Sequence, residues 1–186
     1  MAILSVLKIN KSIFGLRDIS LRNPSRQIQK EELREQWFID FIKDLFETLY
    51  YSPTGVGLAA PQVGVHIRLV AIDMDRDGKN PFPLINPTYE AVNDSIVLSN
   101  ESCLSVPGFV GKVQRHEKIK LTYWDVNGEE IELYVEGFKA KVIQHEIDHL
   151  NGVLYIDRID LCNDLDVSNG LHSIRANKVI EKLYNL

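Results

Sequence analysis

The chain has 186 residues, of which 45% are hydrophobic and 25% are charged, and its formal net charge is −5 at pH 7. This length and composition predict one globular domain over residues 1–186 with a sizeable core. The acidic balance argues against a direct nucleic-acid partner, and no apolar stretch is long enough to predict a membrane span. Two cysteines, Cys103 and Cys162, are too few for a disulfide framework, so a reducing, cytoplasmic compartment is expected.

The first predicted element is an amphipathic helix over residues 30–50, in which apolar side chains recur every four residues from Trp37 to Leu49. Residues 65–73 form a short run rich in β-branched side chains, which predicts a strand. Residues 83–91 are expected to be extended as well, and their two prolines indicate an edge strand.

A hairpin is predicted over residues 119–135, because apolar side chains alternate on both sides of Asn127 and Gly128. This pair suits a tight two-residue turn. A helix is expected over 138–151, and a final helix over about 169–184. The sum is an α+β fold in which short, mostly antiparallel strands surround a central buried helix.

The helix at 138–151 carries His145 and His149 one turn apart, within the sequence HEIDH. Its apolar stripes place both imidazoles on an inward-facing side, where unpaired ring nitrogens would be costly. One divalent metal would satisfy both, because side chains four residues apart on a helix can reach the same ion. Glu146 is then placed to hold a water molecule at the metal. The alternative is a buried helix with two hydrogen-bonded histidines and a surface glutamate.

A third ligand decides which chemistry such a helix supports. One class of metallopeptidase places a third histidine three residues after the glycine of its extended motif, and Tyr155 occupies that position here. Another class takes a glutamate from a following helix, and the only downstream glutamate is Glu181, near the end of the chain. A ligand that precedes the helix is therefore favoured over a metallopeptidase site.

Cys103, in the polar segment NESCLSVPG, is the candidate that precedes the helix. A thiolate with two imidazoles supplies three ligands and leaves a fourth position for water, as a catalytic metal site requires. Taken alone, this cysteine would be interpreted as a small buried hydrophobic residue. Next to the metal helix, we interpret it as the third ligand.

The segment GVGLAAPQ, residues 55–62, lacks the ending of a phosphate-binding loop. Gly55 and Gly57 permit close approach of the backbone, and Pro61 stiffens the run into Gln62. A glutamine held there could donate its amide N–H to a charge that develops beside the metal. Taken alone, the segment is an ordinary connection between a helix and a strand.

GVGLAAPQ, ESCLS and QHEIDH, in this order, resemble the three signature motifs of the peptide deformylases, and the similarity extends from about Leu16 to Ile159. The resemblance implies the α+β fold of that family. It also implies one divalent metal per chain, held by Cys103, His145 and His149. Fe²⁺ is the usual ion in the family, with Zn²⁺, Ni²⁺ or Co²⁺ as substitutes.

The same resemblance implies a reaction. The substrate would be the N-formyl-methionine of a nascent polypeptide, hydrolysed to formate and a free N-terminus. Glu146 would be the general acid and base, and Gln62 and the backbone N–H of Leu104 would form the oxyanion site. The partners would be formyl-methionyl nascent peptides, met near the exit tunnel of the ribosome.

Further substrate contacts are expected around the metal. Val56 and Gly57 would pair with the peptide backbone as an added strand. Phe138 and Val142 lie on the metal-binding stripe of the helix, and they either line the pocket for the methionine side chain or pack in the core. Arg115 either contacts the peptide beyond the methionine or lies on a solvent-exposed strand.

Ser102 departs from the family motif, which usually has glycine at this position, where the backbone helps to hold the substrate. A serine adds a Cβ, and it would add strain if the backbone there needs positive φ. This residue is the one feature that favours a catalytically weak or inactive relative, which would bind nascent chains or ribosomes without turnover.

Overall fold

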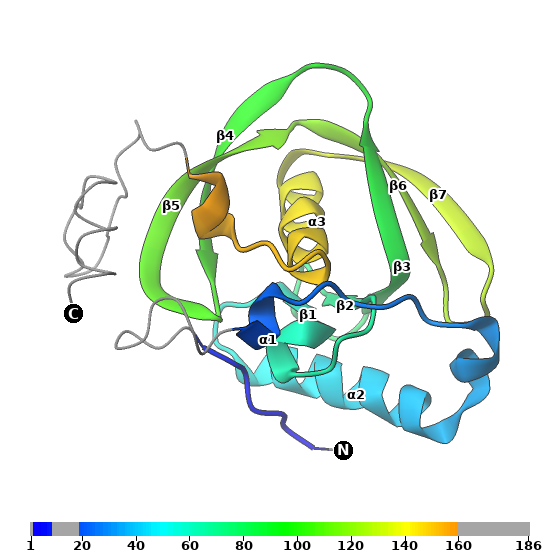
Figure 1. Cartoon of the computed structure of the whole chain (residues 1–186). Coiled ribbons are helices and arrows are strands. Elements are labelled where there is room, and N and C mark those ends of the chain that lie inside the picture. The colour runs from blue at the N-terminus through cyan, green and yellow to red at the C-terminus, as the bar shows by residue number, and fades with distance from the viewer. Residues whose placement is uncertain (1, 9–18, 160–186) are drawn as a thin grey trace.

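The computed structural model describes residues 2–8 and 19–159 (Figure 1). The helix expected at 169–184 lies outside these residues, as do Cys162 and Glu181. None of the described helices combines the length and apolarity that crossing a membrane requires.

The described residues form the α+β fold that the sequence predicts. The α-helices and 3-10 helices (η) are, in chain order, α1 (Ile19–Arg22), η1 (Lys30–Arg34), α2 (Gln36–Tyr51), η2 (Ala60–Val63), α3 (Gly137–Leu150) and η3 (Tyr155–Arg158). The strands are β1 (Gly57–Ala59), β2 (Leu69–Ile72), β3 (Phe82–Ala91), β4 (Ile96–Cys103), β5 (Val106–His116), β6 (Lys118–Trp124) and β7 (Glu130–Glu136).

Two antiparallel sheets surround α3. The larger sheet has the order β1-β2-β3-β6-β7, and β4 and β5 pair in a second sheet. Figure 1 shows α3 in the middle of the molecule, with the β4–β5 hairpin on one side and β6–β7 on the other. The predicted buried helix is therefore the central element of the fold.

The strand predicted at 65–73 is the shorter β2, and both of its faces are covered. Val70 and Ile72 belong to the apolar cluster around α3, whereas Leu69 and Ala71 belong to the cluster around α2. Successive strand residues point to opposite faces, so a short run of apolar residues serves two cores. This packing fixes α3 and α2 on either side of the same strand.

The helix predicted over residues 30–50 is two elements, η1 and α2. Glu35 between them is extended, with ψ of 136°, so the α-helix begins one residue later. The Glu32 carboxylate accepts the backbone N–H of Gln29, which closes η1 as a separate turn. Trp37 is 44% exposed rather than buried.

The prediction that residues 83–91 form an edge strand is wrong, because β3 pairs with both β2 and β6. The register with β6 shifts after Ile85, so Pro87 lies where the ladder is interrupted. Asn86 has a positive φ of 52°, and its side-chain amide bonds both the N–H and the C=O of Ile28. Pro83 lies beyond the last pair with β6. Neither proline therefore interrupts the ladder with β6.

The hairpin predicted over residues 119–135 is present as β6 and β7, in the register that the alternation requires. Its turn is longer than the predicted two residues and runs from Asp125 to Glu129. The Asp125 carboxylate accepts the backbone N–H groups of Asn127 and Glu129, and within this turn only Gly128 has a positive φ. The aspartate stabilises the wider turn.

We expect Asn86→Ala to lower the free energy of unfolding by about 2–3 kcal/mol. The change removes two hydrogen bonds to the Ile28 backbone and leaves alanine in a left-handed conformation. Urea denaturation measures the effect, with Asn80→Ala as the control, because Asn80 is exposed. Equal stability of the two variants would contradict this role of Asn86.

Candidate active site

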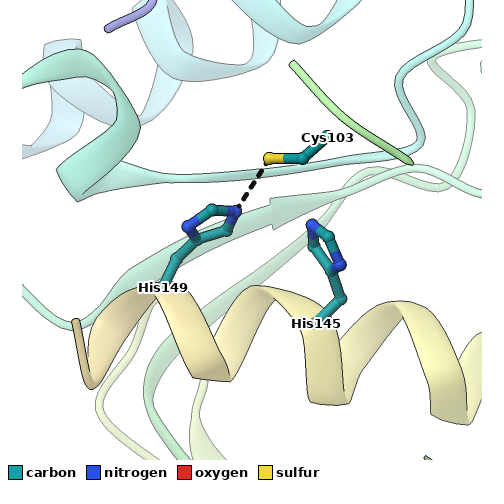
Figure 2. Close-up of side chains that lie close together, drawn as sticks. All are labelled: Cys103, His145 and His149. Atoms are coloured by element: carbon teal, nitrogen blue, oxygen red, sulfur yellow. Dashed lines mark hydrogen bonds between the residues drawn. The ribbon is translucent and has the colours of Figure 1, made fainter. Parts of the chain in front are cut away.

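The site is built on α3, whose residues from Val142 to Leu150 are all buried. Ile143 and Ile147 pack against the large sheet, and they fix the rotation of the helix about its axis. The remaining face presents His145 and His149 toward β4. Figure 2 shows the two imidazoles rising from successive turns of the helix toward the sulfur of Cys103.

Cys103 is the last residue of β4, at the turn that leads into β5. Its Sγ lies 3.2 Å from Nε2 of His149, and one potential ligand atom from each of Cys103, His145 and His149 lies within 4.8 Å of the others. Ligand atoms of a tetrahedral metal site are separated by about 3.6 Å. The structure therefore brings together the three predicted ligands, in a group that fits one divalent metal.

Burial and neighbouring charges shift the pKa values of both histidines in this group. Burial opposes the charged form of His145, but the nearby Cys103 sulfur and Glu101 carboxylate outweigh it and raise the pKa of His145 well above its usual value. Burial and the neighbouring charge of His145 lower the pKa of His149. The Cys103 sulfur and the Glu101 carboxylate thus favour positive charge at His145.

Gln62 lies in η2 with its side chain fixed at both ends. The backbone N–H of Ala59 donates to Gln62 Oε1 at 2.9 Å. The amide nitrogen therefore faces the site, where it lies 3.4 Å from Cys103 Sγ and 3.2 Å from Ser105 Oγ. The structure thus places an N–H donor beside the ligand group.

Glu146 is buried next to the glycine-rich segment. A Cβ at Gly57 would lie 2.5 Å from Glu146 Oε1, so only glycine leaves room for the carboxylate. Glu146 Oε2 is buried and has no hydrogen-bond partner among the described residues. Burial raises the pKa of Glu146 to about 7. A carboxyl group with a free oxygen and this pKa suits proton transfer near neutral pH.

A cavity of about 380 Å³ opens beside these residues. It is bordered by the glycine-rich segment, by β4 and its turn, and by the first three turns of α3. Phe138 is exposed at the start of the helix, and Val142 is buried one turn before the first histidine. Beyond the site residues described above, the predicted residues that line the cavity are Val56, Gly57, Ser102, Leu104, Phe138 and Val142.

Comparisons with known proteins identify the family. A family model described as polypeptide deformylase matches residues 10–164. The peptide deformylase of Azotobacter vinelandii is 42% identical over 157 residues, which cover 84% of this chain and 87% of that relative. The chain belongs to the peptide deformylase family.

Solved structures of peptide deformylases share the fold. The enzyme from Legionella pneumophila matches with a TM-score of 0.78 and 33% identity, over 99% of this chain and 95% of that one. A Met-Ala-Ser-bound peptide deformylase from Acinetobacter baumannii matches with a TM-score of 0.74 and 30% identity, over 85% of this chain and 99% of that one.

Ser102 fits this deformylase backbone without the strain that the sequence raised as a concern. Among the described residues other than glycine, only Arg76 and Asn86 have positive φ, so a Cβ at Ser102 meets no left-handed conformation. The side chain is exposed and lines the cavity. The backbone strain that would favour an inactive relative is therefore absent at this position.

Neither position considered for Arg115 from the sequence is correct. The residue does not lie on a solvent-exposed strand, because its side chain is only 2% exposed, and it is not part of the cavity lining. Its guanidinium donates to both carboxylate oxygens of Glu101 at 2.7 and 2.8 Å, and to Asp148 at 2.6 Å. Arg115 thus joins β5 to β4 and to α3.

Glu101 is a functional residue that the sequence analysis missed. Its Oε2 lies 2.8 Å from His145 Nδ1, and this contact leaves Nε2 of the imidazole free to face Cys103. Burial opposes ionisation of Glu101, but hydrogen bonds from Arg115 and His145 lower its pKa to about 2. Glu101 lies two residues before Cys103 on the same strand, so the alternation of a β-strand indicates that both side chains face the same side.

We expect Glu101→Gln to weaken metal binding by about 10–100-fold and to lower the free energy of unfolding by about 3 kcal/mol. The substitution leaves Arg115 without its buried counter-charge and loosens the orientation of His145. Metal titration of the apoprotein and urea denaturation measure the two effects. The control is Glu90→Gln, because Glu90 is an exposed residue of β3. Unchanged metal affinity in Glu101→Gln would contradict the orienting role.

Proposed function

We propose that this peptide deformylase is a metal-dependent hydrolase that removes the formyl group from the N-terminal methionine of nascent polypeptides and releases formate. The observation that carries the proposal is that ligand atoms of Cys103, His145 and His149 all lie within 4.8 Å of one another, and that Cys103 and His145 line the cavity. Glu146 and Gln62 border the same cavity, so a proton carrier and an N–H donor face the place where a carbonyl would react.

Cys103, His145 and His149 would hold one divalent metal. We infer Fe²⁺, with Zn²⁺, Ni²⁺ or Co²⁺ as substitutes, since a thiolate with two imidazoles suits these ions better than Mg²⁺ or Ca²⁺. When bound, such an ion acts as a Lewis acid toward water and toward the formyl oxygen. Glu101 holds His145 in the tautomer that this ligand set requires.

Glu146 moves the proton. Its unpaired Oε2 accepts a proton from the water that attacks the formyl carbon, and the same carboxyl group then donates that proton to the departing amine nitrogen. The raised pKa, about 7, matches both directions of transfer at neutral pH. Gly57 keeps the carboxylate in place, because any side chain there would displace it.

Gln62 and Leu104 stabilise the negative oxygen of the tetrahedral intermediate. The Gln62 amide is fixed by Ala59 and directed toward the ligand group, so it needs no rearrangement as charge develops. The backbone N–H of Leu104, in the turn after β4, is the second donor. Loss of one such donor costs about 3 kcal/mol of the activation barrier in comparable sites.

The peptide lies along the cavity. Val56 and Gly57 pair with its backbone, which extends the sheet beyond β1. Phe138 and Val142 receive the methionine side chain, and Ser102 borders the following residues at the mouth of the cavity. The Met-Ala-Ser peptide bound to the Acinetobacter baumannii relative has the composition expected of a deformylated product.

The partners we infer are formyl-methionyl chains as they leave the ribosome, in the cytoplasm. An N-formyl group has only hydrogen on its carbonyl carbon. A narrow reaction site that admits hydrogen but no methyl group would separate these chains from acetylated ones.

The experiment that tests this function compares formyl-Met-Ala-Ser, acetyl-Met-Ala-Ser and unblocked Met-Ala-Ser. Anaerobically purified, metal-loaded protein is expected to release formate from the first peptide, with kcat/KM at least about a thousandfold above acetate release from the second. Cleavage of the Met-Ala bond in any peptide would indicate a metallopeptidase. Stoichiometric metal without formate release would indicate an inactive relative.

Two further variants separate metal binding from catalysis. Glu146→Ala is expected to keep its metal and to lose at least about a thousandfold in kcat, because proton transfer is lost. Cys103→Ala is expected to lose both metal and turnover. Elemental analysis and a formate assay measure the two properties. Full metal occupancy in Cys103→Ala would remove the cysteine from the ligand set.

A further inference from the structure

The cavity has a polar end that the proposed reaction does not use. Lys141 lines it, and among the described lining residues this is the only lysine or arginine. Its Nζ lies 3.9 Å from Glu117 Oε2, which is too far for a hydrogen bond. The Lys141 side chain is only 22% exposed, and within the described residues its ammonium group makes no hydrogen bond.

Ser99 lines the same cavity from the opposite element, and it is 8% exposed. Inward-facing and outward-facing residues alternate along β4, so Ser99, Glu101 and Cys103 lie on the same face of the strand. Within the described part of the chain, the Ser99 hydroxyl makes no side-chain hydrogen bond. A second unpaired polar group thus borders the cavity.

Two contacts between β4 and α3 predict that these two polar groups lie at the same depth. Cys103 contacts His149, and Glu101 contacts His145. A step of two residues along the strand therefore corresponds to a step of four residues along the helix. Both steps are about 6–7 Å long. If the same spacing continues, the next step matches Ser99 with the residue four before His145, which is Lys141.

The first side chain of the substrate reaches this depth. It branches from the second atom after the formyl carbon, and bonds of about 1.5 Å place the end of an extended methionine side chain on the order of 6–8 Å from that carbon. This distance corresponds to about one turn of α3 beyond His145. Val142 supplies an apolar wall there, while Lys141 and Ser99 supply donors.

We propose that Lys141, with Ser99 opposite, makes the end of the first side-chain pocket a hydrogen-bond donor site, so that the enzyme also deformylates chains whose first side chain carries an oxygen on its δ atom. Methionine sulfoxide is the foremost case, because it keeps the length of methionine and adds a strong acceptor oxygen at sulfur. The inference rests on the proposed deformylase function and extends it to chains that begin with an oxidised formyl-methionine.

The test compares formate release from formyl-Met-Ala-Ser and from the same peptide with methionine sulfoxide. The wild-type ratio of kcat/KM, sulfoxide over methionine, is expected to lie above about 0.1. Lys141→Met is expected to lower the ratio about tenfold, and Ser99→Ala about threefold, because each removes a donor to the sulfoxide oxygen. Inhibition by the two deformylated peptides reports binding alone, and Lys141→Met is expected to weaken inhibition by the sulfoxide peptide selectively.

Lys139→Met is the matched control. Lys139 belongs to the same helix, but its ammonium lies 4.5 Å above the Phe82 ring and it is not part of the cavity lining. The control is expected to keep the wild-type ratio. Equal ratios in Lys141→Met and Lys139→Met would overturn the proposal. A wild-type ratio below about 0.001 would also overturn it, and this measurement does not depend on whether a variant folds. Absence of formate from both peptides would instead overturn the proposed function, and this inference with it.

Discussion

The contact between Glu101 and His145 is the interaction on which the site depends. It sets the register between β4 and α3, because the same alignment brings Cys103 to His149 one step along. Arg115 neutralises the carboxylate and ties it to Asp148 on α3, so the strand and the helix are linked by buried ionic hydrogen bonds. Charges this far from water need partners, and here each one has them.

Apolar contacts and ionic contacts position different elements around this contact. β2 separates the two apolar clusters and packs against α3 through one face, with apolar side chains only. The ionic group then aligns β4 on the opposite side of the helix. The ligand candidates consequently lie on rigid elements rather than on a long loop, as precise positioning of reacting groups requires.

Much of this arrangement follows from the sequence where a local pattern is strong. The β6–β7 hairpin and α3 have clear periodicities, and HEIDH with Cys103 pointed to the ligand group. The break at Glu35 and the central place of β3 did not follow. The first depends on a side chain that closes η1, and the second on Asn86, whose amide compensates for an interrupted ladder. Arg115 and Glu101 make their contacts only when β4, β5 and α3 meet, which no local pattern in the sequence records.

The way α3 is embedded also bears on how the protein would take up the proposed metal. Small zinc domains fold only when their ion arrives, because they lack a core of their own. Here Ile143, Ile147 and the strand beneath them hold the helix irrespective of what lies above it. Loading, loss and exchange of an ion held by Cys103, His145 and His149 would therefore be events on an already folded scaffold.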